Sequence, residues 1–226
     1  MTQDLSKWTP RQIPDRHMIE GRYVTLEPLN AARHGPDLFQ ASGVSDANDR
    51  FRWLPEYPPQ AEPEFMDWMR RVEASADPLY FAVIDRDTDA AVGRQTLMRI
   101  DAQNGVIEIG NIYWGPDLSR RRGATEALFL FMKLVFDDLG YRRFEWKCND
   151  NNLPSKAAAL RFGFVAEGVF RQHMIVKGQN RDTAWFAIVD GDWPGLKAGY
   201  ENWLEPANFD VNGHQKRRLQ DCLMHG

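Results

Sequence analysis

Hydrophobic and polar residues alternate along several stretches of the chain, as expected for β-strands with one buried face. The first such stretch is 21–29. Between 79 and 114 three more follow one another, separated by short turns rich in Asp, Asn or Gly at 85–89 and 103–105. Strands this closely spaced predict an antiparallel meander. A later stretch, 169–191, predicts a hairpin that turns at 177–180.

Apolar residues at helical spacing predict helices elsewhere. A helix over about 124–139 is apolar nearly all round, with Glu126, Lys133 and Asp137 as a narrow polar stripe, so we expect it to be buried on most sides. Gly140 is placed to end it. Further helices are expected over 31–42 (interrupted near Gly35–Pro36), over 62–74, over 153–164 and after Pro194, with a proline-rich loop over 43–63.

The strand predicted at 141–149 follows the buried helix, so we expect it to pair in parallel with the strand that ends near Trp114. The whole pattern predicts one α/β domain over residues 21–205, with a mixed, mostly antiparallel sheet flanked by helices. Residues 1–20 form an N-terminal extension in this interpretation. Residues 206–226 form a polar C-terminal tail, whose basic cluster at 216–218 the pattern does not assign.

Composition excludes several classes of protein. The chain has 226 residues, 43% hydrophobic and 27% charged, which is typical of a soluble globular protein. Its formal net charge of −4 gives no basic field for nucleic acid. Two cysteines provide neither a disulfide framework nor a metal-binding spacing. With no secretory signal and no apolar run long enough to span a membrane, we expect a cytoplasmic protein without a metal.

Three consecutive arginines, Arg120, Arg121 and Arg122, precede Gly123 at the start of the buried helix. A helix N-terminus carries unpaired N–H groups and the positive end of the helix dipole, so a strand entering it through a glycine-containing turn directs its amides at an anion. The alternative is a solvated turn in which the arginines pair with Asp117 or other carboxylates. The residues by themselves leave both interpretations open.

Two segments resemble the GCN5-related N-acetyltransferases. Residues 120–125 are similar to that family's Gln/Arg-x-x-Gly-x-Gly/Ala signature, except that Thr125 stands where the signature has glycine or alanine. Residues 149–172 resemble its later motif through Asn152, Ser155, Gly163–Phe164 and Glu167–Gly168. The residues flanking the signature are similar to the branch that contains the ribosomal-protein N-terminal acetyltransferases. The resemblance extends from about Gly21 to Trp193.

The resemblance implies acetyl-CoA as co-substrate. In this family the signature loop holds the pyrophosphate, and the two parallel strands splay at their carboxyl ends so that the pantetheine lies between them. The residues implied to bind it are Ile112, Tyr113, Arg120, Arg121, Arg122, Gly123, Ala124, Thr125 and Asn152. For Asn152 the alternative is a helix-capping role.

The family's amine acceptor attacks the thioester directly. Many relatives use a tyrosine to protonate the leaving thiolate, but that position is Ala159 here, so Ser155 is implied as the acid. Its alternative role is a helix N-cap. Glu108 is the candidate base, with a solvent-facing strand charge as the alternative, and Glu145 and His173 are weaker candidates. Ordered water could also take the proton.

We therefore expect an acetyl-CoA-dependent N-acetyltransferase whose acceptor is a protein or peptide N-terminus or a small amine. Trp53, Tyr57, Trp68 and Trp114 are candidates for the acceptor side, although the spacing of Trp68 favours the core. The alternative is a non-catalytic acyl-CoA sensor or interaction domain with the same fold, which Thr125 and the missing tyrosine keep open. Neither membrane nor nucleic acid is expected as a partner, and a homodimer is left open.

Overall fold

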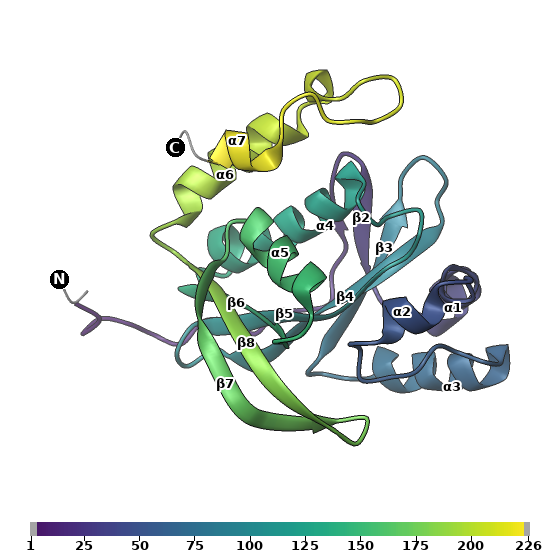
Figure 1. Ribbon diagram of the computed structural model, residues 1–226. Coiled ribbons are helices and arrows are strands. Elements are labelled where there is room, and N and C mark those ends of the chain that lie inside the picture. Colours follow the sequence, from purple (N-terminus) through teal and green to yellow (C-terminus); the bar gives the residue numbers. More distant parts are fainter. Residues whose placement is uncertain (1–3, 224–226) are drawn as a thin grey trace.

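The computed structural model describes residues 4–223, which form a mixed β-sheet with helices on both faces (Figure 1). The strands are β1 (Ile19–Glu20), β2 (Val24–Pro28), β3 (Leu79–Asp85), β4 (Ala91–Asp101), β5 (Val106–Trp114), β6 (Arg143–Asn149), β7 (Val165–Val176) and β8 (Gln179–Val189). The α-helices are α1 (Ala31–Ser42), α2 (Ala47–Phe51), α3 (Glu62–Glu73), α4 (Arg122–Lys133), α5 (Leu153–Arg161), α6 (Trp193–Leu204) and α7 (Leu219–Leu223). A π-helical turn, Leu134–Asp138, extends α4, and a 3-10 turn, Pro206–Asn208, follows α6.

The strand order is β1-β2-β3-β4-β5-β6-β8-β7, and among the described residues only β5 and β6 pair in parallel. The expected α/β domain with a mixed, mostly antiparallel sheet is thus confirmed. Strands β3, β4 and β5 form the predicted meander, and β7 and β8 form the predicted hairpin. Helix α4 makes the crossover between the parallel strands, as predicted.

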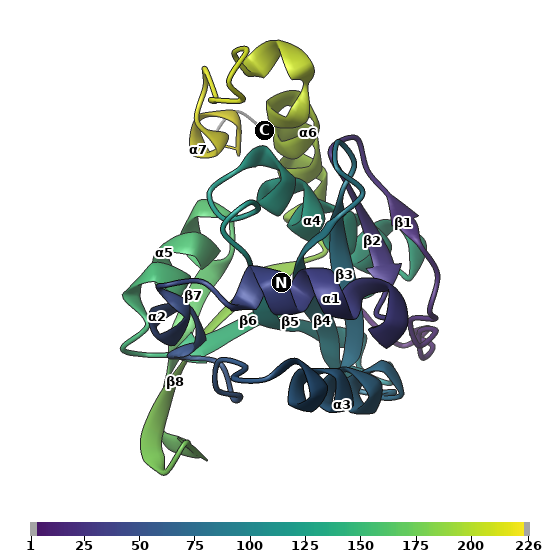
Figure 2. The same ribbon diagram turned by 90° about the vertical axis from the view of Figure 1, so that its right-hand side faces the viewer.

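Two hydrophobic cores lie on opposite faces of the sheet. One packs α4 against the central strands, with Phe131 edge-on to Phe81 of β3 at 5.2 Å between ring centroids. The other packs α1 and α3 against the opposite face, where Phe65 and Met69 meet Tyr80. Figures 1 and 2 show α1 and α3 on one side of the sheet and α4 and α6 on the other. Since both faces of β3 are covered, its sequence is a continuous apolar run.

The parallel strands separate toward their carboxyl ends. Their pairing stops after Ile109 and Trp146, although both strands continue for several residues. Just beyond that point Asn111 has a left-handed φ of +46°, and the register between β4 and β5 shifts as in a β-bulge. The Arg94 guanidinium secures the bulge by donating to the Asn111 carbonyl at 2.9 Å. The backbone of β5 therefore turns away from β6 at this point and leaves a gap in the sheet.

Helix α1 runs without a break, so the predicted interruption near Gly35–Pro36 is wrong. The Asn30 side chain caps its N-terminus, and a Cβ on Gly35 would lie 2.3 Å from the Met66 sulfur of α3. The packing of α1 against α3 thus stabilises the helix by more than it loses through the one backbone hydrogen bond that Pro36 cannot form. The stretch 43–63 was predicted as a loop throughout, which is also wrong because it contains the short helix α2.

Glu126 does not belong to a solvent-facing stripe on α4, as the pattern had suggested. Its side chain is 4% exposed, and its carboxylate accepts backbone N–H groups of Arg22, Tyr23 and Val24 at 2.6–2.8 Å. Helix α4 is thereby tied to the start of β2. The helical pattern could not predict this, because the N–H groups that bind the buried Glu126 carboxylate lie more than a hundred residues away in the sequence.

Residues 206–223 fold back onto α6. The Trp203 indole donates to the Gln215 side chain and to the Arg217 carbonyl, each at 3.0 Å, and α7 buries Leu219 and Cys222. Sequence patterns left this segment unassigned because its few apolar residues make contacts far along the chain rather than with one another.

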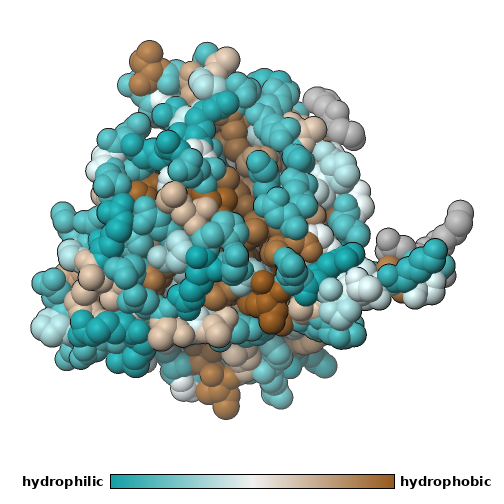
Figure 3. Space-filling model, turned by 180° about the vertical axis from the view of Figure 1, so that it is seen from behind, coloured by the Kyte–Doolittle hydropathy of each residue, from teal (hydrophilic) through white to brown (hydrophobic). Residues whose placement is uncertain are grey.

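Strand β7 lies at the open edge of the sheet and is exposed along nearly its whole length. Its exposed large apolar residues are Val165, Val169, Phe170 and Ile175. Figure 3 shows that the face it draws is mostly hydrophilic, with hydrophobic residues gathered near its centre and its lower tip. An exposed edge strand of this kind favours pairing with a second chain. The homodimer that the sequence left open therefore stays a prediction. Within residues 4–223 no helix has the length and apolar character needed to cross a membrane.

His34 should make the stability of the protein sensitive to mildly acidic pH. The side chain is 1% exposed, its Nδ1 accepts the Asn30 N–H, and its Nε2 lies 3.0 Å from the Glu27 carboxylate. Burial lowers the pKa of His34 below its ordinary value, against the opposing effect of Glu27. Protonation then favours the unfolded chain, so stability present above about pH 6.5 is lost as the pH falls below that value.

Thermal melts between pH 7.5 and 5.5 should therefore show a falling Tm for the wild type, with at most about 1.4 kcal/mol lost per pH unit. His34→Gln should be less stable throughout but have a flatter profile in this window. If Tm fell equally with pH in the wild type and in His34→Gln, His34 would not be the group that causes the pH dependence. Arg33 and Asp37 also face His34, and their opposing effects are the same in both proteins.

Candidate functional site

Two cavities lie next to β5. The first, here called the loop-side cavity, has a volume of about 660 Å³ and is lined by Trp114, Ser119, Arg120, Arg121, Arg122, Ala124, Thr125, Ala158, Arg161, Phe162, Trp203, Phe209, Gly213, His214 and Gln215. The second, here called the strand-side cavity, has a volume of about 530 Å³ and opens where β5 and β6 separate. Its lining includes Glu108, Ile112, Asn152 and Ser155. The predicted site residues other than Tyr113 and Gly123 therefore fall into two groups.

The loop-side cavity contains the N-terminus of α4. Arg122 is the first helical residue, and no side chain within residues 4–223 caps the helix. The Ala124 N–H bonds to the Arg121 carbonyl at 3.2 Å, whereas the N–H groups of Arg122 and Gly123 have no partner among the described residues. None of the three arginines forms an ion pair with another described residue, Asp117 included. Arg122 instead stacks over the Tyr23 ring at 4.1 Å. The pairing with Asp117 considered as an alternative is thus not observed, and the cluster keeps its positive charge for an anion.

Gly123 and Thr125 each have a structural role, and their cofactor contacts stay predictions. A Cβ on Gly123 would lie 2.9 Å from Val24 and 3.2 Å from Leu118, so the glycine is needed for packing against β2. Thr125 is 2% exposed, and its hydroxyl accepts from the Arg161 guanidinium at 3.3 Å. The β-branched residue at this position therefore has a specific partner.

In the strand-side cavity, Asn152 and Ser155 lie at the N-terminus of α5. The Asn152 side chain caps the helix by accepting from the Ser155 N–H at 3.2 Å, so the capping role belongs to Asn152. The interpretation of Ser155 as the cap is wrong. The Ser155 hydroxyl accepts from the Trp146 indole at 3.0 Å, which fixes its oxygen and leaves its proton available to another acceptor.

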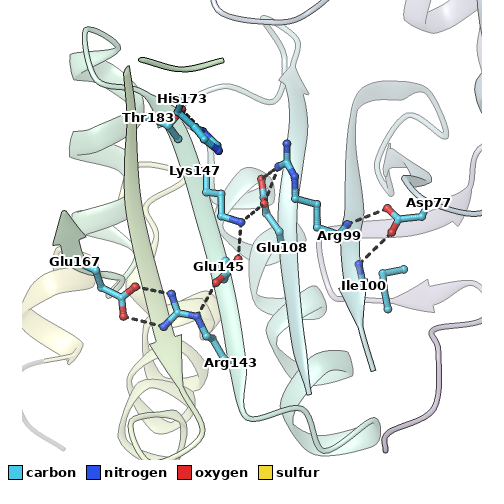
Figure 4. A network of polar contacts seen from close by, with 10 residues as sticks. All are labelled: Asp77, Arg99, Ile100, Glu108, Arg143, Glu145, Lys147, Glu167, His173 and Thr183. Carbon is cyan, nitrogen blue, oxygen red and sulfur yellow. Dashed lines mark hydrogen bonds and ion pairs between the residues drawn. The ribbon is translucent and has the colours of Figure 1, made fainter. Parts of the chain in front are cut away.

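Glu108 is buried, and the alternative of a solvent-facing strand charge is wrong. It is 3% exposed, and its carboxylate binds Arg99 at 2.7 Å and Lys147 at 2.9 Å. Lys147 also contacts Glu145 at 2.6 Å, and Arg143 continues the chain of charges (Figure 4). Figure 4 shows these side chains in a row across β4, β5 and β6. The network fixes the position of the Glu108 carboxylate beside the cavity.

Several sequence candidates lie outside both cavities. The Tyr113 side chain is buried on the other side of β5, where its hydroxyl donates to the Ala41 carbonyl at 2.6 Å. His173 contacts the Thr183 hydroxyl, and Glu145 is engaged in the charge network.

Cys148, by contrast, lines the strand-side cavity. Burial raises the pKa of its thiol, which disfavours the thiolate and makes Cys148 a weak nucleophile.

The aromatic candidates divide in a similar way. Trp53 lines the strand-side cavity, and Trp114 lines the loop-side cavity. Trp68 packs against Phe65 in the core between α1 and α3, as its spacing favoured. Tyr57 lines a third, smaller cavity beside the strand-side one.

Two arginines that line the cavities without an ion-pair partner were missed by the sequence analysis. Arg161, at the end of α5, lines the loop-side cavity, and Arg181, in β8, lines the strand-side cavity. Neither forms an ion pair with another described residue, and burial lowers the pKa of both. No local motif marks either position, because each side chain reaches its cavity only through the folding of distant elements.

Comparison with known proteins agrees with this geometry. Residues 24–165 match the acetyltransferase (GNAT) domain family. The chain belongs to the GNAT family. A crystal structure of a GCN5-related N-acetyltransferase from Brucella melitensis superposes with a TM-score of 0.96 at 60% identity, covering 97% of this chain and 100% of that one. The family resemblance seen in the sequence is thereby confirmed.

More distant GNAT relatives match over shorter ranges. The N-acetyltransferase p20 of Bacillus licheniformis is 29% identical over 119 residues, which are 51% of this chain and 64% of p20, less than two thirds of that relative's length. YdaF of Bacillus subtilis, provisionally named a ribosomal N-acetyltransferase, is 27% identical over 78% of this chain and 88% of its own.

Proposed function

We propose that this GNAT protein transfers the acetyl group of acetyl-CoA to a primary amine. The observation that carries the proposal is the pairing of two cavities next to β5. One presents free N–H groups and three unpaired arginines, which suit a pyrophosphate. The other opens at the break between the parallel strands and contains Ser155, a hydroxyl with an available proton.

In the proposed reaction the amine nitrogen attacks the thioester carbonyl carbon, and the carbon–sulfur bond breaks. Backbone N–H groups of β5 beyond Ile109, which have no partner on β6, polarise the carbonyl. The Ser155 hydroxyl gives its proton to the leaving thiolate and regains a proton from solvent water. Glu108 or ordered water takes the proton that the amine loses. Because Glu108 already binds two cations, we propose that it also keeps Arg99 and Lys147 in place beside the acceptor.

The charges of the acceptor side support an amine that carries a nearby negative group. The Nε atom of Arg181 is buried without a hydrogen-bond partner among residues 4–223. The third cavity, next to Arg181, adds Arg52 and Lys177 and has no carboxylate in its described lining. A polyamine would meet repulsion here. We therefore propose a peptide N-terminus or an amino acid with a carboxylate close to the amine.

Release of free CoA thiol from acetyl-CoA should be measured against peptides, amino acids, polyamines and aminoglycosides, with acidic and neutral peptides in matched pairs. Transfer to an acidic peptide or amino acid is the expected result. Tight CoA binding without turnover across the panel would instead favour the acyl-CoA sensor, the second candidate that Ala159 in place of a tyrosine keeps open. Absence of both binding and turnover would contradict both functions.

Replacing Arg120 and Arg122 by alanine should weaken CoA binding about 10-fold or more in 50 mM salt, and less at high salt because exposed charge interactions are screened. Isothermal titrations at 50 and 500 mM salt measure this. The double variant Arg70→Ala, Arg71→Ala on α3 serves as the control, since it removes the same charge far from the loop. Equal salt dependence of all three proteins would show that the arginines only form a solvated rim.

A further inference from the structure

The third cavity, with a volume of about 380 Å³, continues the strand-side cavity toward the tip of the β7–β8 hairpin. The two cavities share Trp53, Asn149, Val176 and Arg181 in their linings. One wall of the third cavity comes from α2 and the residues that follow it. The other wall comes from the hairpin tip, which projects beyond the rest of the sheet (Figure 1). A molecule whose amine lies in the strand-side cavity can therefore extend into the third cavity.

Lys177 joins the hairpin tip to α2. Its ammonium donates to the carbonyl of Phe51, the last residue of α2, at 2.8 Å and lies over the Tyr57 ring at 4.5 Å. Burial lowers the pKa of Lys177, and no carboxylate among residues 4–223 forms an ion pair with it. A cation kept from water without a counter-ion is costly, so an anion that binds in this cavity would offset that cost.

Arg181 lies between the two cavities as a partly buried guanidinium. Its Nε–H is buried without a hydrogen-bond partner, and no carboxylate within the described part of the chain forms an ion pair with it. Burial lowers the pKa of Arg181, and Cys148 and Glu108 are the acidic groups near enough to oppose this effect. The guanidinium is therefore close to the proposed reaction centre while it also lines the third cavity. A ligand that accepts from its unpaired N–H would remove the cost of burying that group.

The other polar residues of the third cavity also favour an anion. Arg52 adds a third cation. The described lining further contains four amide side chains and no carboxylate; the amides are Asn48, Asn149, Gln179 and Asn180. The Asn149 oxygen already accepts a backbone N–H, which leaves its NH₂ group to donate. Cations and amide donors together match a carboxylate, which accepts several hydrogen bonds and pairs most strongly with a guanidinium.

We propose that the third cavity binds the side-chain carboxylate of an aspartate or glutamate that follows the N-terminal residue of a peptide acceptor, with Arg181 and Lys177 as the specificity-determining residues. The inference rests on the proposed acetyl transfer to a primary amine, and it chooses between the two kinds of acceptor that this function leaves open.

The separation of the two cavities favours a peptide over a free amino acid. An amino acid carries its amine and its α-carboxylate on the same carbon atom, so both groups stay in one cavity. A peptide chain extends by about 3.3–3.6 Å per residue. An acidic side chain a few residues after the amine therefore reaches the adjoining cavity while the amine stays beside Ser155.

The test measures kcat/KM for acetyl transfer to short peptides that carry glutamate at the second, third or fourth position, each against the same peptide with glutamine there. The peptides end in a C-terminal amide, so the side-chain carboxylate is the only negative group. For the wild type, at least one glutamate peptide should exceed its glutamine counterpart by about 10-fold or more, as expected for a charge-assisted hydrogen bond. Free glutamate should be a poorer acceptor than that peptide.

Arg181→Gln should slow transfer to the glutamate peptide far more than transfer to the glutamine peptide, so that the ratio falls to within about twofold of one. Lys177→Gln should lower the ratio in part. Arg171→Gln, at an exposed position of β7, is the matched control and should keep the full ratio.

The outcomes separate this inference from the proposed function. If the wild type acetylates peptides without preferring glutamate at any of the three positions, or acetylates free glutamate fastest, the inference is overturned while the proposed function stands. A preference that Arg181→Gln keeps in full overturns the assignment of Arg181. If the wild type acetylates no amine, the proposed function fails and the inference fails with it. Should Arg181→Gln not fold, Lys177→Gln decides, and an unchanged ratio in that variant overturns the inference.

Discussion

Ser155→Ala should lower the turnover of acetyl transfer by about 100-fold, the usual effect of losing a general acid. Its affinity for CoA should change by less than about twofold, because the hydroxyl acts on the sulfur only as the bond breaks. The structure supports this role through the Trp146 indole, which occupies an acceptor position of the Ser155 oxygen and leaves the proton free. Steady-state kinetics with the best acceptor of the panel, together with CoA titrations, measure both quantities.

Trp146→Phe provides the control for Ser155. It removes the indole donor but keeps the hydroxyl, so most of the turnover should remain. A loss equal to that of Ser155→Ala would mean that the pair is only structural. An unchanged rate in Ser155→Ala would transfer the proton-donating role to water.

Glu126→Ala should destabilise the fold by about 3–5 kcal/mol, since three backbone N–H groups of β2 and its preceding turn lose a charged acceptor in a buried place. The effect should appear as a lower midpoint in urea unfolding followed by circular dichroism. The loss reaches the site as well, because the same bonds hold β2 against the first turns of α4.

Glu201→Ala is the matched control for this substitution. Glu201 is exposed on α6, and its removal should change stability by no more than about 0.5 kcal/mol. Glu126→Gln keeps the size of the side chain but places an amide donor against N–H groups, so it should also destabilise, by less than alanine. A Glu126→Ala protein as stable as Glu201→Ala would show that the three bonds contribute little.

The sheet could be predicted from the sequence because its information is local. Alternating residues and turn-forming residues define β3 to β5 and the β7–β8 hairpin, and a helix between two strands predicts their parallel pairing. The candidate anion site at the start of α4 could be predicted for the same reason, since three arginines, a glycine and an apolar helix are adjacent along the chain.

The charged interior could not be predicted in this way. Glu108 appears as one polar residue in an alternating strand, and only the neighbouring strands show that Arg99 and Lys147 neutralise it. Glu126 was misread for the same reason. Arg161 was missed because its cavity is completed by a segment some fifty residues later in the chain. In each case the partner that gives the residue its role lies far away along the sequence.

The gap between β5 and β6 also has a thermodynamic consequence. Backbone groups beyond Ile109 and Trp146 are left to water in the empty protein, whereas a ligand in the gap can bond them. A ligand that binds only the folded chain stabilises it by an amount that grows with the logarithm of its concentration, about 2.7 kcal/mol at a hundredfold excess over Kd. If the gap binds the proposed acyl donor, the free energy of unfolding should therefore rise with the concentration of that donor.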